Sequence, residues 1–449
     1  MSGMEMVMAE IMREKKPSML RRCREWDYRQ PCIYQITLVL ADRRSQALGR
    51  LVIPEIPEAA ASGTGQAALG AGQGVLGAGQ AELGARQAAV GDKQAVLSAG
   101  QAAVCRRSVL EAAASSYIAL SPAGEAVMRE WRGIAAHHPE VKPLLMQVMP
   151  DHVHFILQVL RPMAKPLGNV IGGFKTGSSK AAIGRPGLWA EGFQDTILFH
   201  EGQLDAMFRY LRDNPRRLAV KRLRPDLFKV RRSLKLQLHD ESLLPSTAQG
   251  SLPSAGAAGF AGHFSAIGNH YLLDEPTKLQ VQCSRSVFAY RRIPKPGGGR
   301  KIARSENGEP IAELATPGFE EKRDELLAAA KHGAVLVSPC ISDGEREIAR
   351  RAFADGTNVI ALRNMGFSPL YKPGGKLFDL TANGKLLLLA PAAWPYQTAE
   401  KPMTRFDACV LNRIAQLIAG DGAAKINYKG MKPSNVDRLM REALAERTL

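Results

Sequence analysis

Met149-Pro-Asp-His-Val-His-Phe-Ile-Leu-Gln-Val159 is the stretch of sequence that decides the fold of the N-terminal half of this chain. Its Pro150-Asp151 pair is typical of a tight turn, and the residues that follow alternate in polarity, as in a half-buried β-strand. Alternate side chains of a strand share a face. One face is therefore expected to enter the core, with Val153, Phe155, Leu157 and Val159.

Two histidines, His152 and His154, project from the opposite face of this predicted strand. Two imidazoles at this spacing can chelate one divalent metal ion. A pair of solvated surface histidines explains the same pattern, since an isolated His-x-His is a weak motif. The position on an amphipathic strand directly after a turn makes both residues candidate metal ligands.

The flanking sequence predicts a small α+β domain around this strand. Residues 143–149 form the first arm of a hairpin that turns at Pro150-Asp151. Hydrophobic periodicity and capping residues place the other elements: strands at 34–40 and 195–199, and helices at 122–138, 166–182 and 202–213. This order predicts a small antiparallel sheet with its helices packed on one face.

Residues 59–106 interrupt the domain with a low-complexity insert. Six consecutive heptads run from Gly65 to Arg106, beginning with GQAALGA and GQGVLGA. Several heptads carry two glycines, each of which costs a helix about 1 kcal/mol, and large apolar residues are too few for a packed seam. The insert is either flexible or weakly helical, or a short coiled-coil arm that could join two copies as a homodimer.

The helix over residues 202–213 brings a tyrosine and an asparagine to one face. Its predicted buried stripe consists of Leu204, Met207, Phe208 and Leu211. Tyr210 lies beside this stripe, and Asn214 follows it by one helical turn. The alternative is a tyrosine at the rim of the core, with Asn214 as a C-cap before Pro215.

Basic residues are concentrated around the same helix. The chain has 60 Lys and Arg against 43 Asp and Glu, a formal net charge of +17, which suggests a polyanionic partner such as nucleic acid. Eleven of them lie between Arg209 and Lys235, against Asp213 and Asp226. We define the basic stripe, a candidate DNA-phosphate surface, as Arg209, Arg212, Arg216, Arg217, Lys221 and Arg222. A solvated helix face is the alternative.

Three segments together resemble one family, the REP-associated tyrosine transposases, which are single-tyrosine HUH transposases of bacterial insertion sequences. Residues 149–156 resemble its HUH motif, two histidines around a bulky apolar residue. Residues 188–195 resemble its W…G[YF]xD segment, and residues 208–217 its tyrosine helix, which ends in Asn-Pro-x-Arg. The resemblance covers about residues 28–228, apart from the insert.

This resemblance implies a ferredoxin-like antiparallel sheet, the HUH endonuclease fold, and a transposase that cuts and rejoins single-stranded DNA at hairpin or repeat ends. It makes Tyr210 the nucleophile, which forms a 5′-phosphotyrosine, and His152 and His154 the ligands of Mg²⁺ or Mn²⁺. Asn214 stands where relatives place a third polar ligand, often glutamine. Two alternatives remain open: a domesticated transposase that binds DNA hairpins without cutting them, and a metal-dependent hydrolase that uses the histidine pair with water.

The C-terminal half of the chain has a different pattern of predicted elements. We expect the first domain to span residues 1–240, a Ser/Gly/Ala-rich linker to span 241–270, and a second domain to span 271–449. Short apolar strands alternate with helices in the second domain, which predicts an α/β fold with a parallel sheet. The strands are expected at 278–282, 334–337, 358–362 and 385–390, and the helices at 320–332 and 345–354.

Residues 333–345, with the strand at 358–362, are similar to the Rossmann-like domain of DNA-processing protein A and of lysine-decarboxylase-like proteins. Ligands of such sheets bind at the carboxyl ends of the strands. Ser284, Arg285 and Ser286 follow a strand end and form a candidate loop for a nucleotide or a DNA phosphate. A purely structural loop is the alternative.

Cysteine usage and the N-terminal sequence bear on the cellular compartment. The six cysteines are scattered without a CxxC pair, so they indicate neither a zinc ribbon nor a disulfide framework. The N-terminal residues lack the apolar core of a signal peptide, and no apolar run is long enough to span a membrane. We therefore expect a cytoplasmic, nucleoid-associated protein with reduced thiols and no membrane partner.

Overall fold

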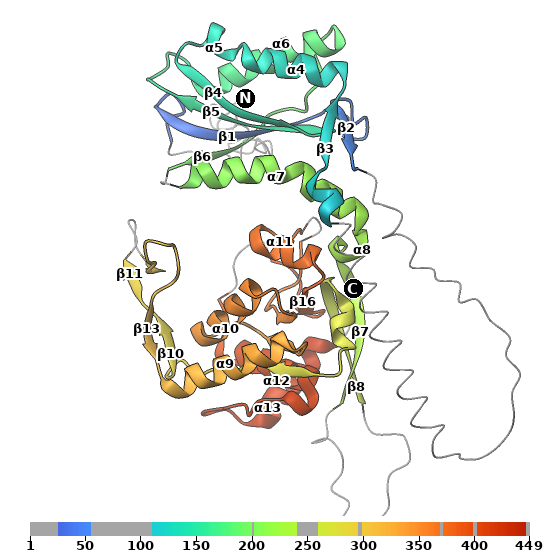
Figure 1. Ribbon diagram of the computed structural model, residues 1–449, viewed down its shortest axis with the longest axis vertical. Coiled ribbons are helices and arrows are strands. Elements are labelled where there is room, and N and C mark those ends of the chain that lie inside the picture. Colours follow the sequence, from blue (N-terminus) through green and yellow to red (C-terminus); the bar gives the residue numbers. More distant parts are fainter. Residues whose placement is uncertain are drawn as a thin grey trace, which may run out of the picture. The chain divides into compact units, whose positions relative to one another are not determined.

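The computed structural model describes residues 26–54, 110–199, 202–239, 259–294, 299–368, 371–397 and 402–445. Internal contacts divide the chain into two units, Met1–Leu223 and Arg224–Leu449, and each mixes helices with strands (Figure 1). The predicted heptad insert at 59–106 lies outside the described residues. Among the described residues, no helix combines the length and the apolar character that crossing a membrane requires.

A four-stranded antiparallel sheet forms the centre of the first unit. Its order is β4 (Val141–Val148), β5 (His152–Val159), β1 (Cys32–Val39) and β6 (Gln194–Leu198). The predicted hairpin is confirmed, with Val148 of β4 opposite Val153 of β5. β1 pairs with the other edge of β5 and sets Thr37 opposite His154.

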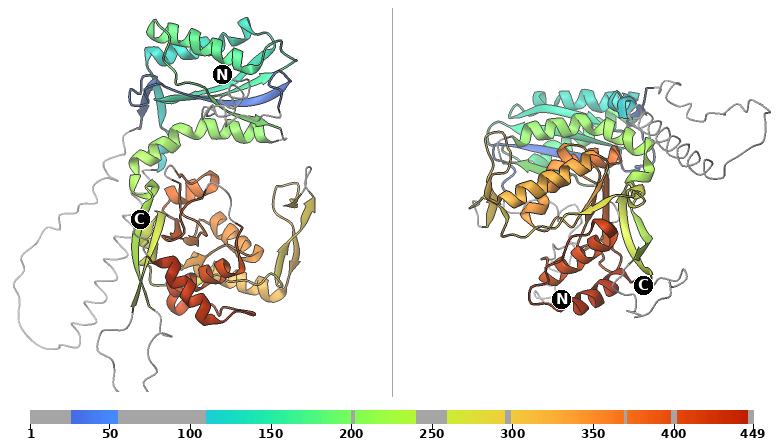
Figure 2. Two further views of the ribbon diagram at one scale, coloured as in Figure 1. Left: turned by 180° about the vertical axis from the view of Figure 1, so that it is seen from behind. Right: turned by 60° about the horizontal axis from the view of Figure 1, so that its bottom comes forward.

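α4 (Pro122–Arg132) and α6 (Leu167–Ile183) cover one face of this sheet (Figures 1 and 2). The predicted helix at 122–138 is divided at Gly133, after which the short α5 (Ile134–His137) follows. The apolar side chains of β5 face α4 and α6 as predicted, and Phe155 meets Phe174 of α6 edge-on at 5.5 Å between ring centroids. The core of the first unit therefore lies on this side of the sheet.

A second, two-stranded ladder joins β2 (Gly49–Val52) to β3 (Tyr117–Leu120). The residues between these strands include the insert, so the two described ends of that long segment are held side by side. The Cα of Gly124 packs so close to β2 that a Cβ there would lie 2.0 Å from the Leu48 carbonyl oxygen. This contact fixes α4 against the ladder and requires glycine at that position.

α7 (Gln203–Leu223) lies across the other face of the sheet, so the prediction that all helices pack on one face is wrong (Figures 1 and 2). The predicted end of this helix near residue 213 is also wrong, because α7 continues through Pro215. A proline inside a helix costs about 3 kcal/mol or more, since it removes one backbone hydrogen bond. Buried apolar residues pack on both sides of the proline, Leu211 before it and Ala219 and Val220 after it. The other residues of the predicted stripe, Leu204, Met207 and Phe208, are only half-buried.

The second unit is built on a six-stranded sheet in the order β7-β8-β16-β15-β14-β9. β9 (Lys278–Gln280), β14 (Val335–Ser338), β15 (Val359–Leu362) and β16 (Leu386–Pro391) are parallel to one another. The predicted parallel strands are therefore confirmed. β8 (Gly259–Gly268) joins β16 in antiparallel fashion, and β7 (Arg231–His239) pairs with β8.

The expected boundaries differ from this structure in two ways. The linker predicted at 241–270 contains strand β8 from residue 259 onward, and β7 belongs to the second unit, which begins at Arg224 instead of after residue 240. Small residues in β8 concealed an alternating pattern in which Phe264 and Ala266 are buried. Gly262 gives Leu444 room to pack, since a Cβ there would lie 3.2 Å from that side chain.

Helices cover both faces of the second sheet, as a parallel sheet requires. One core cluster joins the sheet to α12 (Arg405–Ala419) and α13 (Pro433–Leu444), and the other joins it to α9 (Pro317–Lys331), α10 (Asp343–Ala354) and α11 (Gly375–Ala382). The short α8 (Pro225–Phe228) precedes β7. Two small ladders pair β10 (Phe288–Tyr290) with β13 (Ala312–Ala315) and β11 (Arg292–Pro294) with β12 (Arg300–Ile302).

Candidate active site

The two histidines of β5 lie side by side on the face opposite the core, as the strand pattern predicts. Their rings meet edge-on, with 4.7 Å between centroids. Nε2 of His152 lies 3.1 Å from Nε2 of His154. Two nitrogen lone pairs at this distance repel unless a proton or a cation lies between them, so the pair has the geometry of a chelating site.

The other nitrogen of each ring contacts a polar side chain. Nδ1 of His152 donates to Asp151 Oδ1 at 2.6 Å, and Nδ1 of His154 lies 2.8 Å from Thr37 Oγ1. The hydrogen bond from His152, together with Arg43, lowers the pKa of Asp151 to about 2, despite its partial burial. Burial, and next the proximity of His152, lower the pKa of His154 to about 3, so this imidazole is neutral at physiological pH.

Tyr210 of α7 lies over the histidine pair. Its ring centroid is 6.2 Å from that of His154, and the side chain is 43% exposed. The guanidinium of Arg217, two turns further along α7, lies 5.7 Å from the centroid of the Tyr210 ring. The structure therefore brings the predicted nucleophile together with the predicted metal ligands, although they come from different elements on opposite sides of one interface.

Asn214 follows Tyr210 by one turn and is buried, with only 8% of its surface exposed. Its interpretation as a helix C-cap is wrong, since α7 continues to Leu223. The amide Nδ2 is buried and has no hydrogen-bond partner among the described residues, an arrangement that costs folding free energy. If this side chain holds a cation, its amide oxygen is the ligand atom.

The donor set of this site can hold a divalent cation, but not through acidic residues. Among the described residues, no three His, Cys, Asp or Glu side chains gather as a metal site. Two imidazole nitrogens and one amide leave further positions for water and substrate oxygens, as in catalytic metal centres. Imidazole is a better ligand for Mn²⁺ and later transition metals than for Mg²⁺, which prefers oxygen.

The basic stripe is only partly open to a ligand. Asp213 pairs with Arg216 at 2.5 Å and with Arg217 at 3.7 Å, and Arg222 donates to Gln46 at 3.3 Å. Lys221 is half-buried. Arg209 and Arg212 are exposed, and Arg212 lies 5.8 Å from the centroid of the Phe208 ring. These two arginines present the most accessible positive charge beside Tyr210.

The segment before β6 is a structural support for the site. Trp189 and Phe193 are buried, so they belong to the core and cannot stack on DNA bases. Trp189 donates its Nε1 hydrogen to Ser178 at 2.9 Å. Lys175 Nζ donates to the carbonyl oxygens of residues 190 and 192, at 2.6 and 3.1 Å. These two hydrogen bonds form a carbonyl clamp that holds residues 190–192 against α6.

No protein-family model, no curated protein and no solved structure matches this chain. The likeness to tyrosine transposases therefore rests on three sequence motifs. The likeness of the C-terminal half stands on one strand–helix–strand segment.

A cavity of about 620 Å³ lies at the carboxyl ends of β9 and β14 in the second unit. Ser284 and Arg285 of the predicted loop line it, whereas Ser286 bonds to Ser284 at 2.8 Å. Among the charged residues that line it, four are basic and one, Glu345, is acidic; the basic ones are Arg285, Arg346, Arg405 and Lys429. The Glu345 carboxylate lies at the N-terminus of α10, beside this cavity. It accepts hydrogen bonds from the N–H groups of Ile341 and Ser342 at 2.7 and 3.4 Å.

Two cysteines, Cys283 and Cys340, lie near this cavity. Burial raises the pKa of both Cys283 and Cys340 to about 11, so neither is a thiolate at physiological pH. Cys340 adopts a positive φ of 50° in the turn between β14 and α10. A nucleophilic cysteine requires a lowered pKa, so a thiol-based activity is not supported here.

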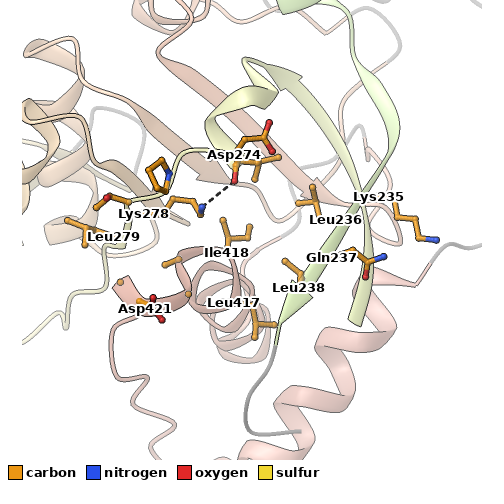
Figure 3. Close-up of a pocket in the computed structure, with 16 residues that line it drawn as sticks. Lys235, Leu236, Gln237, Leu238, Asp274, Lys278, Leu279, Leu417, Ile418 and Asp421 are labelled. Atoms are coloured by element: carbon orange, nitrogen blue, oxygen red, sulfur yellow. Dashed lines mark hydrogen bonds between the residues drawn. The ribbon is translucent and has the colours of Figure 1, made fainter. Parts of the chain in front are cut away.

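A larger cavity of about 850 Å³ lies at the amino end of β9, between β7 and the end of α12 (Figure 3). Leu236, Leu238 and Ile418 form its apolar part. Lys278 at its rim is held by backbone, since Nζ donates to the carbonyl oxygens of residues 273 and 275 at 3.2 and 2.6 Å. The polar groups of this cavity do not converge, so we do not consider it a candidate site.

Proposed function

We propose that the first unit is a single-tyrosine HUH transposase, which cleaves and rejoins single-stranded DNA through a 5′-phosphotyrosine. The observation that carries this proposal is the contact between Tyr210 and His154, with ring centroids 6.2 Å apart. A solvent-accessible phenol beside a pair of imidazoles is an arrangement for nucleophilic attack at a phosphate held nearby. The antiparallel sheet with α7 across its polar face suits the HUH endonuclease fold.

In this reaction the Tyr210 oxygen attacks phosphorus in line with the 3′-oxygen, while the phenol proton passes to solvent. The bond between phosphorus and the 3′-oxygen breaks, and that oxygen takes up a proton to leave a free 3′-hydroxyl. His152, His154 and Asn214 would hold Mg²⁺ or Mn²⁺. Such an ion supplies positive charge to a non-bridging phosphate oxygen as negative charge develops. The new ester retains the energy of the old one, so rejoining needs no ATP.

Arg209 and Arg212 would bind the DNA backbone next to the scissile phosphate. Their exposure and their place on the same helix as Tyr210 favour this role. In single-stranded DNA, as in the unpaired parts of hairpin or repeat ends, phosphates and bases are both accessible to residues of one helix. A cytoplasmic, nucleoid-associated location and assembly as a homodimer are compatible proposals that depend on this function.

A covalent-adduct assay tests the proposal. Single-stranded oligonucleotides that carry repeat ends are incubated with the full-length protein and Mn²⁺ or Mg²⁺, and adducts are resolved on denaturing gels. We expect an adduct with the wild-type protein and with Tyr117→Phe, which alters another exposed tyrosine of the first unit. We expect none with Tyr210→Phe or with the double variant His152→Ala/His154→Ala.

Other outcomes of this assay identify the alternatives. Metal-dependent cleavage that survives Tyr210→Phe would indicate the hydrolase. Hairpin binding by the wild-type protein without cleavage or adduct, across the repeat ends tested, would indicate the domesticated binding protein. Both outcomes contradict the transposase.

We further propose that the second unit, a Rossmann-like domain, binds a nucleotide or DNA phosphate in its basic cavity. Four cationic side chains around one 620 Å³ cavity support an anionic ligand. The test is thermal stabilisation of the full-length protein by nucleotides or by oligonucleotides. Arg285→Ala should abolish the stabilisation, whereas Arg300→Ala, which alters an exposed arginine on β12, should not. Absence of stabilisation by any of these ligands would contradict the proposal.

A further inference from the structure

Thr37 lies opposite His154 across the β1–β5 pair, on the face that carries the candidate active site. The 2.8 Å contact between Thr37 Oγ1 and His154 Nδ1 is a hydrogen bond in which either atom can donate. A neutral imidazole has a single N–H. The direction of this bond therefore decides whether the proton of His154 lies on Nδ1 or on Nε2.

The contacts of the buried Gln35 side chain show which group is the hydrogen-bond partner of His154 Nδ1. Its Nε2 donates to the Ile36 carbonyl oxygen at 3.1 Å and to Thr37 Oγ1 at 2.9 Å. Because a carbonyl oxygen only accepts, the Ile36 contact identifies this end of the side chain as the NH₂ group, and both of its hydrogens are used. His154 Nδ1, 3.3 Å from Gln35, is consequently left to the Thr37 hydroxyl.

We propose that Thr37 is a positioning residue that makes His154 a metal ligand; this inference rests on the metal-dependent function proposed above. A metal ion binds the lone pair of a ring nitrogen, so His154 can ligate through Nε2 only when its proton is on Nδ1. An acceptor beside Nδ1 stabilises that tautomer. The Thr37 oxygen is the nearest acceptor that the structure offers there.

A hydroxyl suits this position because it can both donate and accept. Without metal, Thr37 donates to His154 Nδ1, and His154 donates from Nε2 to Nε2 of His152, whose own hydrogen is on Nδ1 toward Asp151. With a cation held by the histidine pair, the single proton of His154 would lie on Nδ1 and Thr37 would accept it, with no change in the number of protons. The Thr37 hydrogen then turns to solvent, which its partial exposure permits.

Three variants of the full-length protein separate this role from a packing role. Thr37→Val keeps the shape of the side chain and removes the hydroxyl, while Thr37→Ser keeps the hydroxyl. Thr196→Val is the matched control. Thr196 of β6 pairs with Gln35 and therefore lies on the same face of the sheet as Thr37, but it is bonded to neither histidine among the described contacts. Electron paramagnetic resonance of free Mn²⁺ measures the dissociation constant, and thermal unfolding shows that each variant is folded.

We expect Thr37→Val to weaken Mn²⁺ binding by about 10-fold or more, as loss of an outer-shell partner of a metal ligand typically does. Thr37→Ser and Thr196→Val should bind Mn²⁺ as the wild-type protein does. Unchanged binding by Thr37→Val would overturn the role of Thr37 and leave the proposed function intact. Failure of the wild-type protein to bind Mn²⁺ would overturn the metal centre itself, and the role of Thr37 with it.

A second measurement keeps the inference testable if Thr37→Val does not fold. Long-range ¹H–¹⁵N spectra of histidine-labelled wild-type protein report which ring nitrogen carries the proton. We expect the His154 signals, assigned through His154→Gln, to change from the Nε2–H form to the Nδ1–H form when Mg²⁺ saturates the site. An Nε2–H form that persists in the saturated protein would overturn the proposal.

Discussion

Asn214 lies one helical turn after Tyr210 on α7, yet Asn214 is buried and Tyr210 is open to solvent. Within the part of the chain that the structure describes, the amide nitrogen of Asn214 has no hydrogen-bond partner, so the side chain lowers stability without an evident structural benefit. One helix therefore presents an exposed phenol and, one turn further on, a buried amide. This arrangement permits stability and activity to be separated by mutation.

Asn214→Ala should leave the free energy of unfolding within about 1 kcal/mol of the wild-type value, because the loss of side-chain packing is offset by removal of an unsatisfied polar group. The same change should reduce adduct formation by roughly 10-fold or more, as loss of a ligand-shell group does. Asn214→Gln, which keeps the amide, should recover part of the activity. Urea denaturation and the adduct assay measure the two effects; full activity of Asn214→Ala would remove Asn214 from the metal centre.

Lys175→Met should destabilise the first unit by about 2 kcal/mol, because two backbone carbonyl oxygens would lose their donor in a half-buried position. The methionine retains the length and most of the apolar stem of lysine. Urea denaturation checks the change in stability. Lys180→Met, on the same helix but exposed, is the control and should change the free energy of unfolding by less than about 0.5 kcal/mol. Equal effects of the two substitutions would show that the carbonyl clamp contributes nothing.

The sequence correctly predicted those elements whose structure follows from the order of polar and apolar residues within the element itself. Alternation over residues 152–159 was sufficient to assign β5 and both of its faces, since one face is apolar throughout. The position of α7 was not predictable in this way, because its apolar stripe packs on a surface that also carries His152 and His154. Long-range packing likewise decides that the helix survives Pro215 and that β8, with its glycines and alanines, becomes a strand.

The candidate site shows the same limit. His152, His154, Tyr210 and Asn214 were identified from motifs that resemble those of tyrosine transposases, in which these residue types occur at this spacing. Thr37 was missed, since a threonine in a strand carries no local signal and acquires its role only through the register of β1 on β5. The ion pairs of Asp213 with Arg216 and Arg217 were also missed, although their helical spacing of three and four residues indicates them.

The second unit should lose stability in acid through Glu347. Burial favours the protonated form of this carboxyl, but hydrogen bonds from Arg350, Arg351 and Tyr290 outweigh it and lower the pKa to about 2, from an ordinary value of 4.5. A carboxylate with a lowered pKa in the folded protein contributes stability that is present above pH 4.5 and is lost as the pH falls toward 2. The thermal midpoint of the wild-type protein should therefore fall between pH 5 and pH 3.

Glu347→Gln isolates this contribution. At pH 7 the variant should be less stable by roughly 2 kcal/mol, because two arginines and a buried phenol lose a charged acceptor. Between pH 5 and pH 3 its thermal midpoint should fall less steeply than that of the wild-type protein. Glu321→Gln, an exposed residue of α9, is the control and should follow the wild-type profile. Parallel wild-type and Glu347→Gln profiles would contradict the assigned role.

The basic stripe predicts a specific dependence of DNA binding on salt. Each phosphate contact to single-stranded DNA contributes about 0.7 to the slope of log affinity against log salt, so Arg209→Ala/Arg212→Ala should lower that slope by about 1.4. Fluorescence anisotropy of a labelled oligonucleotide measures it, in the Tyr210→Phe background to prevent covalent capture. The matched control is Arg129→Ala/Arg132→Ala, which removes the same charge from exposed positions of α4 on the opposite face of the sheet. If both double variants lower the slope equally, the net charge of the protein governs binding. Arg209 and Arg212 would then not be the specific phosphate contacts beside Tyr210.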